Sequence, residues 1–546
     1  MTEQLQTKLF SNKKIKISAA DFPKKKVIFK TYTQEQQFLL PKNLNDFVGS
    51  GHIGRLVNTI INEMNTSFIT RTYKGGGTSA YDPKMLLKVW VLGFIYKSYS
   101  CRTLAKYLRE SLPFIWISGN QTPDFRTLNN FRLRLKEDIK KIFKQIVFYA
   151  IENKIIDAKD IFVDHTKREA NANKHSVIWK KQVEKQLAKI DEELEELFKY
   201  VDKVNEEEEK IFGRKDLPEQ ERHKFNEEKV REIVKKINEK VKNSEKTREE
   251  AKEQKEKIRR IKELQQRQTA YQRKKEILGI KNSFSKTDND AVAMMMKDKL
   301  TVRPAYNEGV AVEHGFVLNY IISQSCADNI SFIPLMEGVI DNIKKTPENV
   351  NSDAAYGSEE NMAFLENNKI GNYLKYNLFQ KEKSKKWKAE KFRFQDFSFD
   401  KEKDEFICPN NVKLKFIEQW EEKKNNYIRE IKKYQAELGH CISCPFRDKC
   451  TKAKARTIEV SWNGEKLRQQ AKINLESNKG KELRERRGNE VESVFGDQKL
   501  NKDKKRYNLR GLLKVNLEAG LYYISHNIRK VYTMNLLTNQ KGLFLS

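Results

Sequence analysis

The chain has 546 residues and carries 107 lysines and arginines against 76 acids, which gives a formal charge of +31. This balance points first to nucleic acid as a partner and second to an anionic membrane surface. No apolar run approaches the roughly 20 residues that span a bilayer, and the start of the chain lacks the apolar core of a signal peptide, so we expect a cytoplasmic protein.

Residues 1–40 are basic and irregular, which suits either an arm that follows phosphates or a solvated terminus. Residues 41–150 predict a helical domain. The apolar run 85–96 predicts a buried helix, Ser100 is a typical N-cap for the next one, and Pro123-Asp124 opens another that continues to Ile139. Short helices with basic faces favour a DNA reader of the helix-turn-helix kind, although an ordinary helical domain shows the same pattern.

Two acidic residues directly follow short apolar segments that predict strands. Asp164 follows residues 161–163, and Asp353 follows residues 349–352 and precedes a glycine turn and a helix that starts at Ser358. Between them, residues 309–312 and 316–322 predict paired strands, and residues 332–343 predict a helix. A carboxylate beside a buried strand is held rigidly, as a metal ligand must be. The alternative is an aspartate that caps a turn.

Residues 177–283 are dominated by Lys, Glu, Arg and Gln. Apolar residues at alternating spacings of four and three form a heptad seam: Val183, Leu187, Ile190, Leu194, Leu197, Val201 and Val204. A turn bracketed by Gly213 and Pro218 leads to a second seam at Val230, Val234, Ile237 and Val241, which fades before Ile258 and Leu264. This predicts an inserted antiparallel helical hairpin, which either dimerises, reaches along DNA or serves as a solvated spacer.

Residues 370–480 are polar and read as irregular, and they contain a group of cysteines: Cys408, Cys441, Cys444 and Cys450. A Cys-x2-Cys pair with two further cysteines can complete a tetrahedral zinc site, with His440 as a substitute ligand. Free thiols or a redox pair are the alternatives. Cys101 and Cys326 lie in apolar contexts and are expected in the core.

Residues 484–499 predict a helix on which Glu492, Phe495 and Lys499 share one face. A carboxylate beside a cation suits a metal ion next to a phosphate, whereas an amphipathic surface helix is the plain alternative. The basic run that follows, with Arg506 and Arg510, suits DNA, and residues 512–531 predict a core helix.

Together these motifs resemble the DDE transposases of bacterial insertion sequences, within the ribonuclease-H-like and retroviral-integrase superfamily. The three acid motifs of that family are similar to the segments 163–173, 353–358 and 487–499. The block ahead of the sheet is similar to residues 283–290, 306–308 and 327–328. The helical N-terminal domain is similar to residues 83–135. The chain departs from the pattern at three places. His165 follows the first Asp, Arg484 stands where the signature has Tyr, and the interval from Arg487 to Glu492 is one residue longer.

The resemblance implies an α/β fold: a ribonuclease-H-like, mixed five-stranded sheet with flanking helices. Residues 151–176, 284–369 and 481–546 would form this catalytic domain, interrupted by the hairpin 177–283 and the insertion 370–480, after the arm 1–40 and the DNA-binding domain 41–150. Asp164, Asp353 and Glu492 would bind two Mg²⁺ or Mn²⁺ ions, with Asp164 bridging them.

In the same resemblance, DNA phosphates would contact Arg487 and Lys499 near the cut, with Arg506 and Arg510 further along. The implied activity is cleavage at the terminal inverted repeats of an element and strand transfer into target double-stranded DNA. A homodimer in the DNA complex and a nucleoid-associated location are expected with it. A nuclease of the same fold without strand transfer and a non-enzymatic DNA-binding protein are the alternatives.

Overall fold

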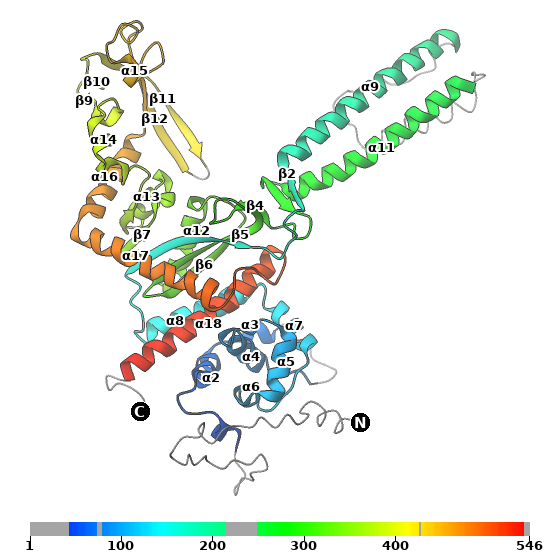
Figure 1. Cartoon of the computed structure of the whole chain (residues 1–546), viewed down its shortest axis with the longest axis vertical. Helices are drawn as coiled ribbons and strands as arrows, with labels where there is room; N and C mark the ends of the chain where they lie inside the picture. The colour runs from blue at the N-terminus through cyan, green and yellow to red at the C-terminus, as the bar shows by residue number, and fades with distance from the viewer. Residues whose placement is uncertain (1–42, 72, 74–78, 213–247, 425–426, 540–546) are drawn as a thin grey trace, which may run out of the picture. The chain divides into compact units, whose positions relative to one another are not determined.

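A computed structural model of the chain describes residues 43–71, 73, 79–212, 248–424 and 427–539 (Figure 1). Contacts between Cα atoms divide the chain into two compact units, Met1–Gly49 and Ser50–Ser546. In the described part of the first unit, η2 (Leu44–Phe47) is a short 3₁₀ turn capped by the Asn43 side chain. The expected basic arm, residues 1–40, lies outside the described residues.

The second unit begins with a group of helices: α2 (Ile53–Glu63), α3 (Ser67–Thr70), α4 (Pro83–Ile95), α5 (Cys101–Glu110), α6 (Leu112–Ile117), α7 (Phe125–Arg134) and α8 (Ile139–Glu152). The sequence predicted α4 as a buried helix, and its side chains are buried from Met85 to Phe94. Ser100 caps α5 and Asp124 caps α7, each by accepting a hydrogen bond from a backbone N–H in the first turn. The helical N-terminal region is thus confirmed.

One expected boundary in this region is wrong. The sequence predicted a single helix through Ile139, but α7 ends at Arg134 and α8 begins at Ile139 after a four-residue turn. The turn ends at Asp138, a residue type that favours helix starts. The change of direction lets α8 pack against α12 and α18.

The central sheet is mixed and has six strands: β1 (Asp160–Glu169), β4 (Val292–Met295), β5 (Val302–Glu313), β6 (Phe316–Ser323), β7 (Asn349–Ser352) and β8 (Gly371–Leu374). β1 pairs antiparallel with β5 and parallel with β7, and β7 pairs parallel with β8. On the edge of β5 that faces away from β1, both β6 and the short β4 pair with β5. The sheet therefore has one strand more than the five that the resemblance implied. The predicted paired strands are β5 and β6, joined at His314 and Gly315, which adopt positive φ values of 52° and 70°.

Helices connect and cover this sheet. After the short turn η3 (Asn329–Ser331), α12 (Phe332–Ile343) joins β6 to β7; η4 (Ala354–Tyr356) and α13 (Glu359–Asn367) join β7 to β8. Near the C-terminus, α17 (Asn478–Gly496) contacts β1, β5 and β7, continues as a π-helical turn, η7 (Asp497–Asn501), and is followed by α18 (Leu512–Asn539). The expected helices at 332–343, after Ser358 and at 512–531 are confirmed. No helix among the described residues has the length and apolar character needed to cross a membrane.

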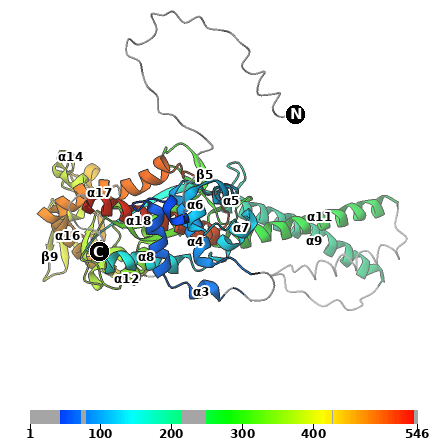
Figure 2. The same ribbon diagram turned by 90° about the horizontal axis from the view of Figure 1, so that it is seen from below.

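The segment between β1 and β5 contains the expected antiparallel helical pair. α9 (Lys180–Phe212) and α11 (Arg248–Leu278) lie side by side in both views (Figure 1 and Figure 2). At their base β2 (Val177–Trp179) pairs antiparallel with β3 (Ser283–Ser285). The seam of α9 packs on Ile258, Ile261 and Leu264 of α11, which the predicted second seam did not include. The predicted seam Val230–Val241 and the turn at Gly213 lie outside the described residues.

Residues 370–480 are regular, which corrects the expectation of an irregular insertion. A second, five-stranded antiparallel sheet contains β9 (Ser398–Asp400), β10 (Glu405–Ile407), β11 (Lys413–Lys424), β12 (Tyr427–Ala436) and β13 (Thr457–Val460). The same region contains four short helices, η5 (Lys381–Lys383), α14 (Lys385–Ala389), η6 (Phe394–Asp396) and α15 (Arg447–Cys450). The longer α16 (Trp462–Glu476) contacts β12 of this sheet and β8 of the central sheet. The charged residues of β11 and β12 hide the strand pattern, because the core uses few positions on each strand, such as Phe406, Leu414 and Tyr434.

Candidate active site

Two of the predicted acids meet at one arginine. Asp164 lies on β1, and Asp353 directly follows the neighbouring parallel strand β7. Arg487 of α17 approaches both, with Nη2 3.2 Å from Asp164 Oδ2 and 3.6 Å from Asp353 Oδ2. The sequence predicted Asp164 at the end of a strand, and this is wrong. Asp164 lies inside β1, because β1 continues to Glu169 by pairing with β5. The sheet therefore brings together acids that are far apart in the sequence.

The alternation of β1 places a series of polar side chains along one path. Asp164, Thr166 and Arg168 are two residues apart, so they point to the same face. Lys499 donates a hydrogen bond to the Thr166 hydroxyl. Arg168 forms a fully buried ion pair with Glu308 of β5, at 2.6 Å. The predicted cation Lys499 is thus held beside the predicted acid Asp164.

Glu492, the third predicted acid, does not join the other two in this structure. Its side chain is exposed, and it makes no hydrogen bond or ion pair within the described part of the chain. The physical reason is helical geometry. Glu492 follows Arg487 by five residues, which is about 140° around a helix of 3.6 residues per turn. When Arg487 faces the two aspartates, Glu492 points away from them.

Burial and charge set the protonation of this site. Burial raises the pKa of Asp164 to about 6; Arg487 opposes this rise, and Asp353 adds to it. Burial lowers the pKa of Lys499 to about 8, and nearby Lys297 lowers it further, while Glu308 and Asp164 oppose the change. The sequence did not single out Lys297, an exposed residue in the loop after β4.

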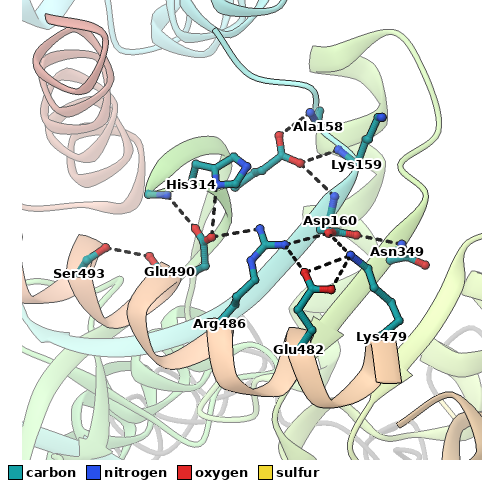
Figure 3. A network of polar contacts seen from close by, with 12 residues as sticks. Ala158, Lys159, Asp160, His314, Asn349, Lys479, Glu482, Arg486, Glu490 and Ser493 are labelled. Atoms are coloured by element: carbon teal, nitrogen blue, oxygen red, sulfur yellow. Dashed lines mark hydrogen bonds and ion pairs between the residues drawn. The ribbon is translucent and has the colours of Figure 1, made fainter. Parts of the chain in front are cut away.

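A polar network holds α17 against the start of β1 (Figure 3). Asp160 accepts hydrogen bonds from Lys479 Nζ at 2.9 Å and from Arg486 Nη1 at 3.0 Å, both on α17. Glu313, at the end of β5, accepts from the backbone N–H groups of residues 158–160. Since Arg486 precedes Arg487, these contacts fix the helix face that meets the two aspartates.

Residues 165 and 356 form a second polar pair that the sequence did not assign. His165 Nδ1 and the Tyr356 hydroxyl share a hydrogen bond. Burial lowers the pKa of His165 to about 4, so its ring is neutral at pH 7. Gly309 makes room for the ring, because a Cβ there would lie 2.3 Å from His165 Nε2. His165 and Tyr356 lie in the predicted acid motifs 163–173 and 353–358, but no spacing in the sequence indicated that the two side chains meet.

The two predicted DNA-binding arginines beyond α17 contact the protein itself. Arg506 donates to the carbonyl oxygens of Ala170 and Ala172, each at 2.9 Å, and Arg510 Nε donates to that of Asn171 at 2.7 Å. Both arginines are exposed, and they hold the segment that follows β1.

The four predicted zinc ligands gather in one place. Cys408, Cys441, Cys444 and Cys450 line the same small cavity, together with His440. All four are free thiols. The backbone N–H of Arg456 donates to Cys441 Sγ at 3.3 Å. The expectation that Cys101 and Cys326 lie in the core is wrong. Cys101 is half-buried, and Cys326 is exposed.

The side chains at the acid site have the right chemistry for a metal ion, but they are not placed to bind one together. Carboxylate oxygens are the ligands that Mg²⁺ and Mn²⁺ prefer. Within the described ranges, however, no three His, Cys, Asp or Glu side chains are placed to hold a metal ion together, at the acids or at the cysteines. At the acids, Arg487 supplies the positive charge between Asp164 and Asp353.

Comparison with known families gives two matches. Residues 42–134 match the model described as transposase domain DUF772, and residues 407–532 match the model described as transposase DDE domain. The second match includes the cysteine group and Glu492, whereas Asp164 and Asp353 lie outside both. Searches of curated proteins and of solved structures gave no match. The two matches, on separate parts of the chain, support an insertion-sequence DDE transposase.

Proposed function

We propose that this transposase cuts DNA at the ends of an insertion sequence and joins the new ends to target DNA. The observation that carries the proposal is the meeting of Asp164 and Asp353 at neighbouring strands, beside the cations Arg487 and Lys499. The strand order β6-β5-β1-β7-β8, with β7 and β8 parallel to β1, supports a ribonuclease-H-like catalytic domain.

Asp164, Asp353 and Glu492 are the residues that would hold divalent metal ions in this proposal. Two such ions would activate a water molecule or the 3′-hydroxyl of a DNA end as the nucleophile and would offset charge on the leaving oxygen. Mg²⁺ and Mn²⁺ both suit an all-carboxylate set. Because Glu492 is exposed and Arg487 lies between the aspartates, the proposal requires α17 to shift or Arg487 to turn when DNA arrives.

The cations would position the DNA strand. Lys499 is anchored by Thr166 on the same face of β1 as Asp164, so its ammonium group can hold a phosphate close to the acids. Arg487 would exchange its two carboxylates for a phosphate, to which its planar group can donate two hydrogen bonds. The DNA would be double-stranded, with element ends and target held by a homodimer.

The test is a strand-transfer assay on the full chain. Labelled duplex ends from the DNA that flanks the gene are incubated with plasmid and Mg²⁺, and joined products are counted. We expect joining that Asp164→Asn and Asp353→Asn abolish, while duplex binding persists, because each change removes a metal ligand and no phosphate contact. Nicking without joining would instead support a nuclease. Binding without any cutting would support a non-enzymatic DNA-binding protein.

A further inference from the structure

A cavity of about 820 Å³ lies outside the acid site, at the start of α5 and α7. Residues 508 and 509, from the segment between η7 and α18, complete its wall. The two sides are tied together, because Tyr99 donates a hydrogen bond to the Lys502 carbonyl oxygen, and Lys502 Nζ donates to those of Phe94 and Ile95. Its volume lies in the range of small-molecule binding sites.

The wall of this cavity is positively charged. Lys97, Arg102, Arg126 and Arg132 line it, and among the described residues no aspartate or glutamate does. The first turn of α5 also faces it, so backbone N–H groups at a ten-residue helix start add partial positive charge. An anionic ligand fits these groups.

Three aromatic rings share the same wall: Tyr99, Tyr107 and Phe125. The guanidinium groups of Arg102 and Arg126 lie 5.3 and 5.7 Å from the centre of the Phe125 ring. Phe125 is an exposed large apolar side chain. Aromatic and guanidinium planes together stack on unpaired nucleobases, whereas paired bases in a duplex offer them no free face.

We propose that this cavity binds an unpaired nucleotide of a DNA strand. The base stacks at Phe125 and the tyrosines, and the phosphate lies against Arg102, Arg126 and the start of α5. The inference rests on the proposed function in that the DNA is the same substrate. It adds that the helical region holds a single-stranded segment next to the duplex, as opening of the element end would produce.

The experiment measures binding alone, in buffer with EDTA, so it stands apart from cleavage. A fluorescent duplex is compared with the same duplex carrying a short 5′ single-stranded tail, and with a tail whose sugars lack bases. Stacking of one base is worth about 1–3 kcal/mol, so we expect the tail to tighten binding about tenfold. The tail without bases should lose this gain, and 2-aminopurine in the tail should be quenched.

Variants locate the effect. Phe125→Ala and Arg102→Gln should remove the preference for the tail and leave duplex binding nearly unchanged. Phe148→Ala and Arg109→Gln serve as matched controls, since both side chains are exposed on helices of the same region and lie outside the cavity wall. Equal affinity for blunt and tailed DNA would overturn the proposal, as would an equal gain from the tail without bases or an unchanged preference in Phe125→Ala.

Discussion

Arg487 determines what the acid site can do in the absence of DNA. Its side chain is 18% exposed, and its guanidinium group contacts both Asp164 and Asp353. An arginine here neutralises part of the charge that two close carboxylates would otherwise carry. The same arginine competes with any cation for those oxygens, so its position and that of Glu492 are linked through the helix that carries both.

Glu492→Gln tests whether the exposed glutamate is the third acid. We expect strand cleavage to fall by about a thousandfold or more, because a lost metal ligand removes several kcal/mol of transition-state stabilisation. Glu485→Gln is the matched control, since Glu485 is exposed on the same helix one heptad earlier. Single-turnover cleavage at saturating Mg²⁺ measures both. Full activity in Glu492→Gln would remove this residue from the acid set.

Arg487→Gln tests the competition between arginine and metal. Removing the charge should tighten binding of Mn²⁺ to the DNA-free protein by about tenfold, because a cation near 4 Å at a protein surface is worth about 4 kcal/mol before solvent screening. Titration followed by electron paramagnetic resonance measures this without any reaction. Lys481→Gln, an exposed change on the same helix, should leave Mn²⁺ binding unaltered. Unchanged affinity in Arg487→Gln would show that Arg487 does not occupy the metal position.

At the scale of elements, the junction of α17 and α18 depends on one buried carboxylate. Asp497, at the π-helical turn, accepts hydrogen bonds from Tyr522 at 3.1 Å and pairs with Arg529 at 2.5 Å, both on α18. His526 lies 3.4 Å away. Burial alone would raise the pKa of Asp497, but His526 and Arg529 more than offset it and hold this pKa well below its usual range.

Asp497→Asn should therefore lower the free energy of unfolding by about 1–3 kcal/mol at pH 7. A depressed folded-state pKa stabilises the protein above the pKa of the unfolded chain, and that stabilisation is lost as the pH falls toward the folded-state pKa. The difference between wild type and variant should thus shrink in acid. Urea denaturation at several pH values measures it, with Asp503→Asn, which changes an exposed neighbour, as control. A difference that grows in acid would contradict this account.

The cysteine cavity predicts a structural zinc ion in the second sheet domain. We expect one zinc per chain in purified protein, most of it lost in Cys441→Ser together with a lower melting temperature, because a metal staple stabilises a domain with a small core. Cys326→Ser, outside the group, should keep the metal. Absence of zinc with all four thiols freely reactive would eliminate the site.

The sequence predicted elements where a local signal was strong. The cap Ser100, the helix start near Asp124, the β5–β6 hairpin and the strand before Asp353 follow from capping, turn and alternation patterns. It failed where pairing decides the outcome. β1 continues through Asp164 because β5 lies beside it, and β11 and β12 form a ladder despite their many charges.

The candidate site shows the same division. Motifs indicated Asp164, Asp353 and Lys499, but only the fold shows that Arg487 faces the aspartates while Glu492 does not. The buried pair of Arg168 and Glu308 was equally invisible, because residues 140 positions apart meet only when β1 and β5 are in register.

At the scale of the whole molecule, the helical pair α9–α11 is an insertion whose two ends are close. Asp191 accepts a hydrogen bond from Gln268 at 2.6 Å across the pair. Below that point Val183, Leu187, Leu278 and Phe284 form a separate small core at the base. The outer part of the hairpin can therefore be removed while this base core stays covered.

Replacing residues 192–267 by a short Gly-Ser loop should leave DNA affinity and its salt dependence nearly unchanged. Acids almost balance the bases in this segment, so the cations that neutralise phosphates lie elsewhere. Each neutralised phosphate contributes about −0.9 to the slope of log affinity against log salt, and about six to ten contacts give a slope of roughly −5 to −9. Anisotropy titrations over a salt series measure the slope, and light scattering measures assembly, which should change if the seam joins subunits. A slope that collapses in the shortened chain would place the DNA on the hairpin, and a slope near zero in the full chain would contradict binding through a basic surface.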